Sequence, residues 1–222
     1  TSVKLPEGVN SIGNYAFRDC SGLNSITIPD SLTTISSYAF QYCSGLTSVV
    51  FSEELTAIGD SAFSNCTGLT SIEIPSSITT INKSVFSGCS GLTSVTLPET
   101  LTTISGYAFS GCTSLESFVF PNSVTLAGEY VFSGCTSLKS VTFSSALTEV
   151  RLGFFMNCTS LTEVHFSDDF NMVLKRAFSG CTALKTIGSN VELDVVEDEA
   201  FLGCSSLESI NLSPELEEIG MR

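Results

Sequence analysis

The sequence is poor in the residues on which most catalytic and nucleic-acid-binding sites depend. It has one histidine, and its 9 lysines and arginines face 23 aspartates and glutamates, which gives a formal net charge of −14 at pH 7. A surface of this charge repels phosphate groups, so we expect no nucleic-acid binding and no attraction to anionic membranes. The same surface suits a positively charged partner.

Long apolar runs are also missing. Because no stretch reaches about 18 apolar residues, we expect no membrane-spanning helix and no direct insertion into a membrane. The first residues contain neither a basic region nor an apolar stretch, so we expect no signal peptide here and interpret the sequence as a piece of a longer protein. Hydrophobic residues make up 42% of the chain and charged residues 14%, which predicts a packed core.

Motifs for nucleotide binding and catalysis are absent. Neither G-x-x-x-x-G-K-[ST] nor G-x-G-x-x-G occurs, and the lone histidine, His165, has no second histidine with which to form a metal site. We therefore expect no enzymatic activity, and we assign no catalytic, cofactor-binding or metal-binding residue.

A repeat of 23 residues runs through the whole chain. Cysteines stand at positions 20, 43, 66, 89, 112, 135, 158, 181 and 204, with a phenylalanine three positions before each of them and a leucine three positions after. No insertion or deletion breaks this register. We predict a single domain over residues 1–222, with nine complete repeats and partial repeats at both ends.

One repeat, residues 92–114, illustrates the structure that this pattern predicts. Val95 and Leu97 would point to one side of an extended segment and Thr96 to the other. A unit of this length cannot bury its apolar side chains alone, but stacked coils can, with each strand paired to its equivalent in the next coil. The phenylalanines, Phe109 among them, would form an aromatic spine opposite the sheet.

The pattern L-x-x-I-x-I-P-x-x-L-x-x-I-x-x-x-A-F-x-x-C resembles the leucine-rich repeat of BspA-like proteins, also called the Treponema pallidum type. The first clear matches are Leu23, Ile26, Ile28, Pro29, Leu32, Ile35, Ala39, Phe40 and Cys43. The resemblance implies a leucine-rich-repeat solenoid, a curved right-handed coil stack with a parallel β-sheet on one face and short turns or helical turns on the other. Such proteins are mostly surface or secreted proteins of bacteria and protozoa with roles in adhesion. The resemblance therefore implies an extracellular or cell-surface location and a host or extracellular-matrix protein as partner.

The repeat becomes less regular towards the C-terminus. The position that holds glycine in several repeats is occupied by Arg151, Leu174 and Glu197 in the later ones. The small residue before phenylalanine is replaced by Phe154, and an apolar strand position is replaced by Ser189. We expect the fold to persist through repeats seven to nine with some loss of regularity. Simple drift and a recognition role both remain open for these repeats.

The cysteines do not fit a disulfide framework. Their number is odd, no C-x-x-C occurs, and equivalent positions in stacked coils would lie about 4.8 Å apart with parallel Cα–Cβ vectors. We interpret all nine as buried thiols that pack as small apolar residues.

The outward position of each strand is the best candidate for a partner-binding surface. A mixture of apolar, hydroxyl and charged residues occupies it: Thr27, Val50, Glu73, Thr96, Val119, Thr142, His165 and Asn211. Such variation is expected of a tailored surface and equally of an unconstrained one. A rigid structural spacer that displays another domain and an intracellular interaction scaffold are alternatives, and uncapped ends would permit self-association.

Acidic residues recur just after the strands. They are Glu7, Asp30, Glu53, Glu54, Glu99, Asp168, Asp169, Glu192 and Glu215, and a second cluster holds Glu197, Asp198 and Glu199. In a solenoid the first set would form an acidic ridge along one edge. We interpret it as a solvated edge; a site for a basic partner or for weakly held calcium is the alternative.

Overall fold

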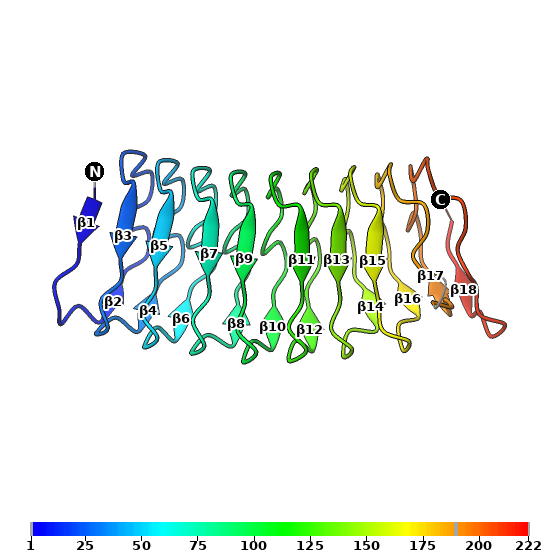
Figure 1. The fold of residues 1–222 in the computed structure, drawn as a ribbon, viewed down its shortest axis with the longest axis horizontal. Helices are drawn as coiled ribbons and strands as arrows, with labels where there is room; N and C mark the ends of the chain where they lie inside the picture. Colours follow the sequence, from blue (N-terminus) through cyan, green and yellow to red (C-terminus); the bar gives the residue numbers. More distant parts are fainter. Residues whose placement is uncertain (1, 189–190, 222) are drawn as a thin grey trace.

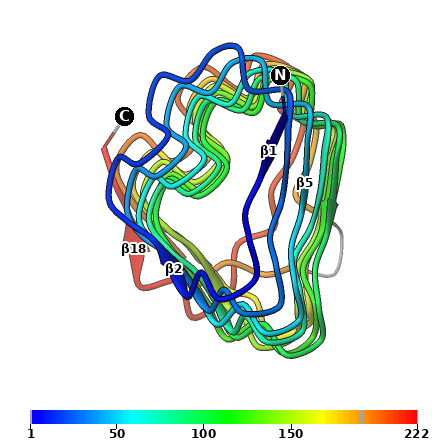
Figure 2. The same cartoon turned by 90° about the vertical axis from the view of Figure 1, so that its left-hand side faces the viewer.

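The computed structural model describes residues 2–188 and 191–221, and it shows one continuous stack of coils from end to end (Figure 1). Ser189 lies outside the described residues. Viewed along the stack, the chain descends past β1 (Ser2–Lys4), crosses below and returns past β2 (Ser11–Ile12) (Figure 2). It winds clockwise as it recedes, which makes the solenoid right-handed. The middle coils stand farther out on the β1 side than the first coils, so the stack is curved, as predicted.

The strands of three residues lie on one side of the stack, which we call the front face (Figure 1). Each pairs in parallel with its equivalent one repeat away, so that Ser25 aligns with Ser48 and Ser117 with Ser140. This register confirms the sheet that the repeat predicted. The front strands after β1 are β3 (Ser25–Thr27), β5 (Ser48–Val50), β7 (Ser71–Glu73), β9 (Ser94–Thr96), β11 (Ser117–Val119), β13 (Ser140–Thr142) and β15 (Glu163–His165).

A second set of parallel strands, each of two residues, follows the first and was not predicted from the sequence. In β4, for example, Ile35 is fully buried and aligns with Ile58 of the next coil. After β2 these strands are β4 (Thr34–Ile35), β6 (Ala57–Ile58), β8 (Thr80–Ile81), β10 (Thr103–Ile104), β12 (Leu126–Ala127), β14 (Glu149–Val150), β16 (Met172–Val173), β17 (Val195–Val196) and β18 (Glu218–Ile219).

The rest of each coil consists of turns, and no helix occurs among the described residues. The turn around each phenylalanine is bonded to the next coil: the Phe40 N–H donates to the Ala62 carbonyl over 2.8 Å. Two positions per turn adopt left-handed backbone angles, as at Ser84 (φ 57°) and Gly88 (φ 73°). The helical turns that the resemblance allowed for are therefore replaced by tight turns, which need positive φ to reverse the chain within so few residues.

The predicted aromatic spine is confirmed. Consecutive rings from Phe17 to Phe201 stack face to face, with centroids 5.1 to 5.9 Å apart. A second group of rings fills the interior of the fifth to seventh coils, where Phe154 is fully buried and packs against Phe132 and Phe143. The larger residue at position 154 therefore extends the core and does not disturb it.

Eight of the nine cysteines are buried free thiols, as predicted. Each of the eight donates a hydrogen bond from Sγ to the carbonyl oxygen of the phenylalanine 26 residues earlier, at 3.0 to 3.3 Å. The prediction is wrong for Cys20, which is exposed. Its turn belongs to the first coil, so a neighbouring turn covers it on one side only.

Candidate functional site

The front column consists of the eight residues Thr27, Val50, Glu73, Thr96, Val119, Thr142, His165 and Asn211. The first seven lie at the ends of the front strands with their side chains directed away from the core. All are exposed except Thr142, which is half-buried. Val50 and Val119 are 61% and 66% exposed, which is unusual for valine in a strand and gives this face apolar contact points.

Asn211 does not belong to the paired face, contrary to the prediction. The last front strand is β15, and the described residues of the two coils that follow it form no equivalent. The only ladder remnant there is an isolated bridge between Leu193 and Leu212. The expected loss of regularity near the C-terminus is thus confirmed for these two coils.

His165 has one charged neighbour. Its Nε2 lies 3.6 Å from the Glu163 carboxylate on the same strand, and both side chains are exposed. Thr142 aligns with His165 in the ladder. An exposed imidazole beside a single carboxylate and a threonine is an ordinary surface arrangement.

The front sheet is interrupted twice. Within the described chain, β5 does not pair with β7, and β9 does not pair with β11. After β3, β7, β11 and β13, the residue that follows the strand donates its N–H to the next coil, as Ile74 does to the Thr96 carbonyl over 3.0 Å. Phe51 and Leu97 hold the same position at the interruptions, and in the described structure neither makes this bond. The front column therefore divides into three groups of paired strands.

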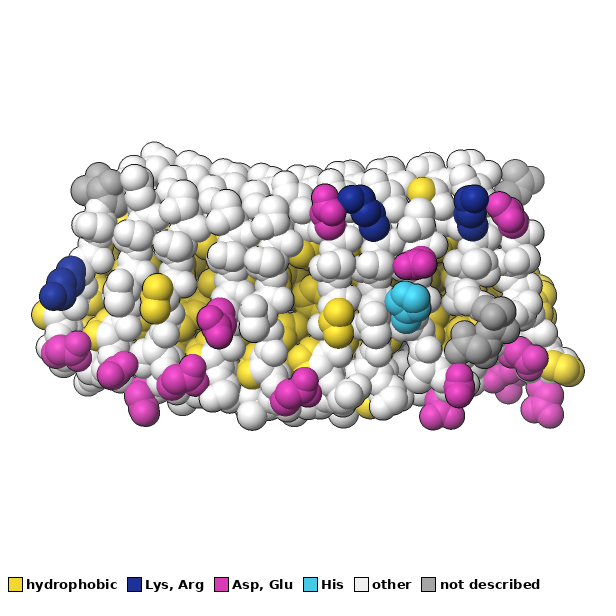
Figure 3. All heavy atoms as spheres, viewed as in Figure 1, with side chains coloured by type: hydrophobic (Ala, Val, Ile, Leu, Met, Phe, Trp, Pro, Cys, Tyr) yellow, Lys and Arg dark blue, Asp and Glu magenta, His cyan; other side chains and the backbone are white. Residues whose placement is uncertain are grey.

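Each interruption opens a hollow on the front face. The first notch, of about 210 Å³, is lined by Val49, Val50, Phe51, Glu53, Glu73 and Pro75. The second notch, of about 470 Å³, is lined by Val95, Thr96, Leu97, Glu99, Val119, Phe120, Pro121, Asn122, Thr142 and Phe143. Figure 3 shows hydrophobic surface recessed between the columns of this face. Sequence reasoning identified the column but missed both notches.

The acidic ridge forms as expected. All nine of its residues are exposed, and acidic side chains gather along the lower edge of the front face (Figure 3). Glu53 accepts hydrogen bonds from the Ser76 N–H and Oγ at 3.1 and 2.8 Å. In the described part of the chain, no three histidine, cysteine, aspartate or glutamate residues come close enough to hold a metal ion, so the calcium alternative gains no support.

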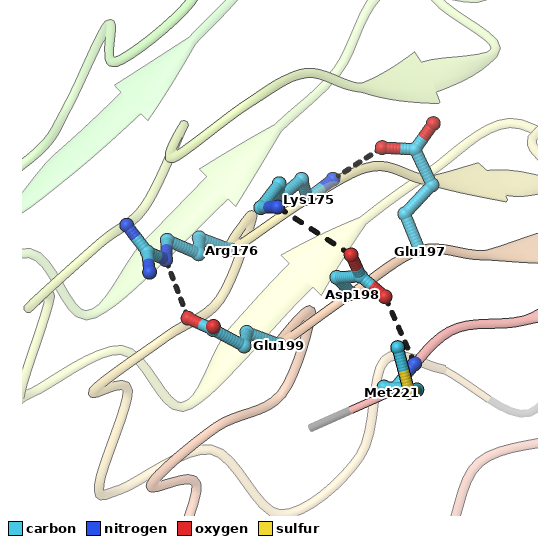
Figure 4. A network of polar contacts seen from close by, with 6 residues as sticks. All are labelled: Lys175, Arg176, Glu197, Asp198, Glu199 and Met221. Atoms are coloured by element: carbon cyan, nitrogen blue, oxygen red, sulfur yellow. Dashed lines mark hydrogen bonds and ion pairs between the residues drawn. The ribbon is translucent and has the colours of Figure 1, made fainter.

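Side chains of the second acidic cluster form ion pairs and hydrogen bonds within the fold. Asp198 lies 3.4 Å from the Lys175 Nζ and also accepts the Met221 N–H, while Glu199 pairs with Arg176 (Figure 4). The Arg176 guanidinium beside it lowers the pKa of the Glu199 carboxyl below its ordinary value. These contacts join residues one coil apart, so the cluster links neighbouring coils at the surface.

The buried cysteine thiols are unreactive at neutral pH. Burial raises the pKa of Cys43 and Cys204 to about 11 and that of Cys89 and Cys135 to about 12. A thiol with so high a pKa carries almost no thiolate at neutral pH, so it is a poor nucleophile and a poor metal ligand.

The family model of the BspA type leucine rich repeat region matches this sequence in six copies, over residues 1–116, 56–185 and 102–222. Among curated proteins, none matches the sequence. None of the described residues forms a helix that is both long and apolar enough to cross a membrane.

Leucine-rich-repeat proteins are among the solved structures with similar coordinates. The leucine-rich-repeat protein of T. pallidum is 26% identical with a TM-score of 0.56, over 82% of this chain and 77% of its own. The pneumococcal vaccine antigen PcpA is 20% identical with a TM-score of 0.55, over 96% of this chain and 67% of its own. A protein from Bacteroides ovatus is 26% identical with a TM-score of 0.46, over 99% of this chain and 82% of its own.

Proposed function

The chain belongs to the BspA-type leucine-rich-repeat family, and from that membership we propose that it is a non-enzymatic module that binds another protein on its front face. The observation that carries the proposal is the contrast between this face and the core. The phenylalanine, cysteine and leucine columns stay the same from coil to coil, whereas the front column changes and exposes valine at two places. Solenoids of this kind offer such faces as extended binding surfaces.

The size of the face supports a protein as the partner. Front strands continue through eight coils, from β1 to β15, and adjacent strands lie about 4.8 Å apart. A surface of that length exceeds what a small molecule covers, and specific protein interfaces bury roughly 800 Å² on each side. The shallow notches add anchor points to it but no enclosed pocket.

We further propose a host or extracellular-matrix protein as the partner and a secreted or cell-surface protein as the source of the module. Both proposals rest on the resemblance to BspA-like repeats. The acidic ridge and the net charge of −14 favour a partner whose contacting surface is positively charged.

The test is capture of purified extracellular-matrix and cell-surface proteins on the immobilised chain. A variant with Val50→Ser, Glu73→Gln, Val119→Ser and His165→Gln changes only exposed side chains of the front column. A control with Leu126→Ser and Glu129→Gln alters exposed side chains that lie away from the front column.

We expect the native chain and the control to capture the same protein and the front-column variant to lose it while remaining folded. Capture by none of the three would favour the rigid-spacer alternative. Equal capture by all three would place binding outside the front column.

A further inference from the structure

The two notches share features that the rest of the front face lacks. Each lies where neighbouring strands have separated, and each has an apolar floor, formed by Phe51 in the first and by Val95, Leu97 and Phe120 in the second. An exposed valine stands at the margin of each, Val50 and Val119 respectively. The second recess, of about 470 Å³, has more than twice the volume of the first, of about 210 Å³, so each has room for at least one apolar side chain.

Backbone groups are also left available there. The Phe51 N–H would reach the Glu73 carbonyl in an intact ladder, and the Leu97 N–H would reach that of Val119, but the described structure contains neither bond. Both residues are half-buried. Partly buried backbone groups are almost always paired, so these positions favour an incoming polar group that can complete them.

The charge around the notches has one sign. Between residues 48 and 122 the sequence has six acidic residues and one basic residue, Lys83, which lies over the ring of Tyr107, a residue in the turns, and not at a notch. Glu73 lines the first notch and Glu99 the second, and in the described structure neither carboxylate has an ion-pair or hydrogen-bond partner. Some other carboxylates of this face are paired, as Glu116 is with Lys139 at 2.8 Å.

We propose that the two notches together anchor one extended segment of the protein partner, in which apolar side chains stand next to lysine or arginine. The apolar side chains enter the notches, and the cations meet Glu73 and Glu99 at their margins. Two paired strands, β7 and β9, separate the notches, so the anchors lie at least about 10 Å apart. Extended chain covers that distance in about three or four residues. This inference rests on the proposed function and specifies the partner's chemistry.

The first probe is a synthetic peptide with two phenylalanines four residues apart, a spacing that puts both on one face of an extended chain. Lysines stand between and beside them, and the peptide is labelled for fluorescence anisotropy. One matched peptide replaces the phenylalanines by serine, and the other replaces the lysines by glutamate. The variant Glu73→Gln with Glu99→Gln removes two unpartnered exposed carboxylates, so it should not perturb folding. Glu129→Gln with Glu217→Gln makes the same charge change away from the notches.

We expect the native chain to bind the first peptide and to bind both matched peptides more weakly. The notch variant should weaken binding roughly threefold to tenfold, and the control variant should leave it unchanged. Higher salt should weaken binding to the native chain more than binding to the notch variant. Equal binding of the serine peptide, or equal loss in both variants, would overturn the proposal in favour of a general charge effect.

Failure of the notch proposal can be distinguished from failure of the proposed function. If the front-column variant loses the captured protein while Glu73→Gln with Glu99→Gln retains it at full affinity, the front face is the binding surface and the notch proposal is wrong. Loss of the captured protein in the notch variant, with retention in the Glu129 and Glu217 control, supports the notch proposal in the context of the natural partner.

Discussion

The thiol of Cys66 donates a hydrogen bond to the carbonyl oxygen of Phe40, one coil back, over 3.2 Å. The same bond recurs for every later cysteine, so the thiol column both fills the core and satisfies a carbonyl in each turn. The Phe40 carbonyl also accepts the N–H of Cys43 over 3.1 Å, so alanine at position 66 would remove the second of its two hydrogen bonds and leave a small void. A small apolar side chain with a weak donor therefore suits the position.

The burial of this column predicts a sharp pattern of thiol reactivity. In the native protein, a maleimide or disulfide reagent should label one cysteine, Cys20, and in denaturant it should label all nine. Peptide mapping after labelling checks the assignment, and Cys20→Ser should abolish the native signal. Native labelling of several cysteines at the rate of Cys20 would contradict the buried column.

The raised thiol pKa values predict a loss of stability at alkaline pH. A thiol of the unfolded chain ionises near pH 9, whereas Cys89 and Cys135 in the fold do so near pH 12. Above pH 9 the unfolded state therefore releases protons that the folded state retains. The contribution of the thiols to the free energy of unfolding should be constant below about pH 8. It should fall as the pH rises, by up to about 1.4 kcal/mol per pH unit for each buried thiol.

Denaturant unfolding between pH 8 and 10 measures this dependence. The window lies below the pH at which most tyrosines and lysines titrate. A flat profile would mean that the buried thiols ionise in the native state.

The aromatic spine should dominate the stability of single coils. Phe109 is fully buried and stacks on Phe86 and Phe132, with centroids 5.6 and 5.9 Å away. Phe109→Ala should lower the free energy of unfolding by about 3–5 kcal/mol, whereas Glu99→Gln at the exposed edge should change it by less than about 0.5 kcal/mol. Comparable shifts of the two urea midpoints would contradict the assignment of core and edge.

The periodic residues were enough to predict most of this fold. Phe109 and Cys112 recur at a fixed interval, and a side chain that recurs in every coil of a stack must meet its equivalents, so core columns follow from spacing alone. The short strand at Thr103–Ile104 escaped prediction because two residues with one buried side chain give no alternation to detect.

The notches could not be predicted because the repeat pattern treats isoleucine, leucine and phenylalanine as equivalent. At both interruptions the inward residue after the strand changes in size, from Phe51 to Ile74 and from Leu97 to Phe120. The same change between Ile28 and Phe51 leaves the ladder intact. The size of this residue alone therefore does not determine whether neighbouring front strands pair. The repeat pattern therefore contains no signal for which strands separate.

The turns should contain backbone strain that a single glycine can relieve. Ser84 has a left-handed backbone (φ 57°), a conformation that costs a residue with a Cβ about 1–2 kcal/mol. Its hydroxyl makes no hydrogen bond in the described structure, so Ser84→Gly removes strain without removing a contact. Part of the gain is offset because glycine adds freedom to the unfolded chain. We expect Ser84→Gly to raise the free energy of unfolding by up to about 1 kcal/mol.

Ser87 provides a matched control in the same turn. It is half-buried like Ser84 but has no positive φ, so Ser87→Gly brings only the entropic cost and should destabilise the protein by about 0.5–1 kcal/mol. The two substitutions change the same atoms within one coil, and only the backbone angle distinguishes them. Urea unfolding of both variants should therefore give shifts of opposite sign. Destabilisation of equal size would show that the left-handed turn at Ser84 is not strained.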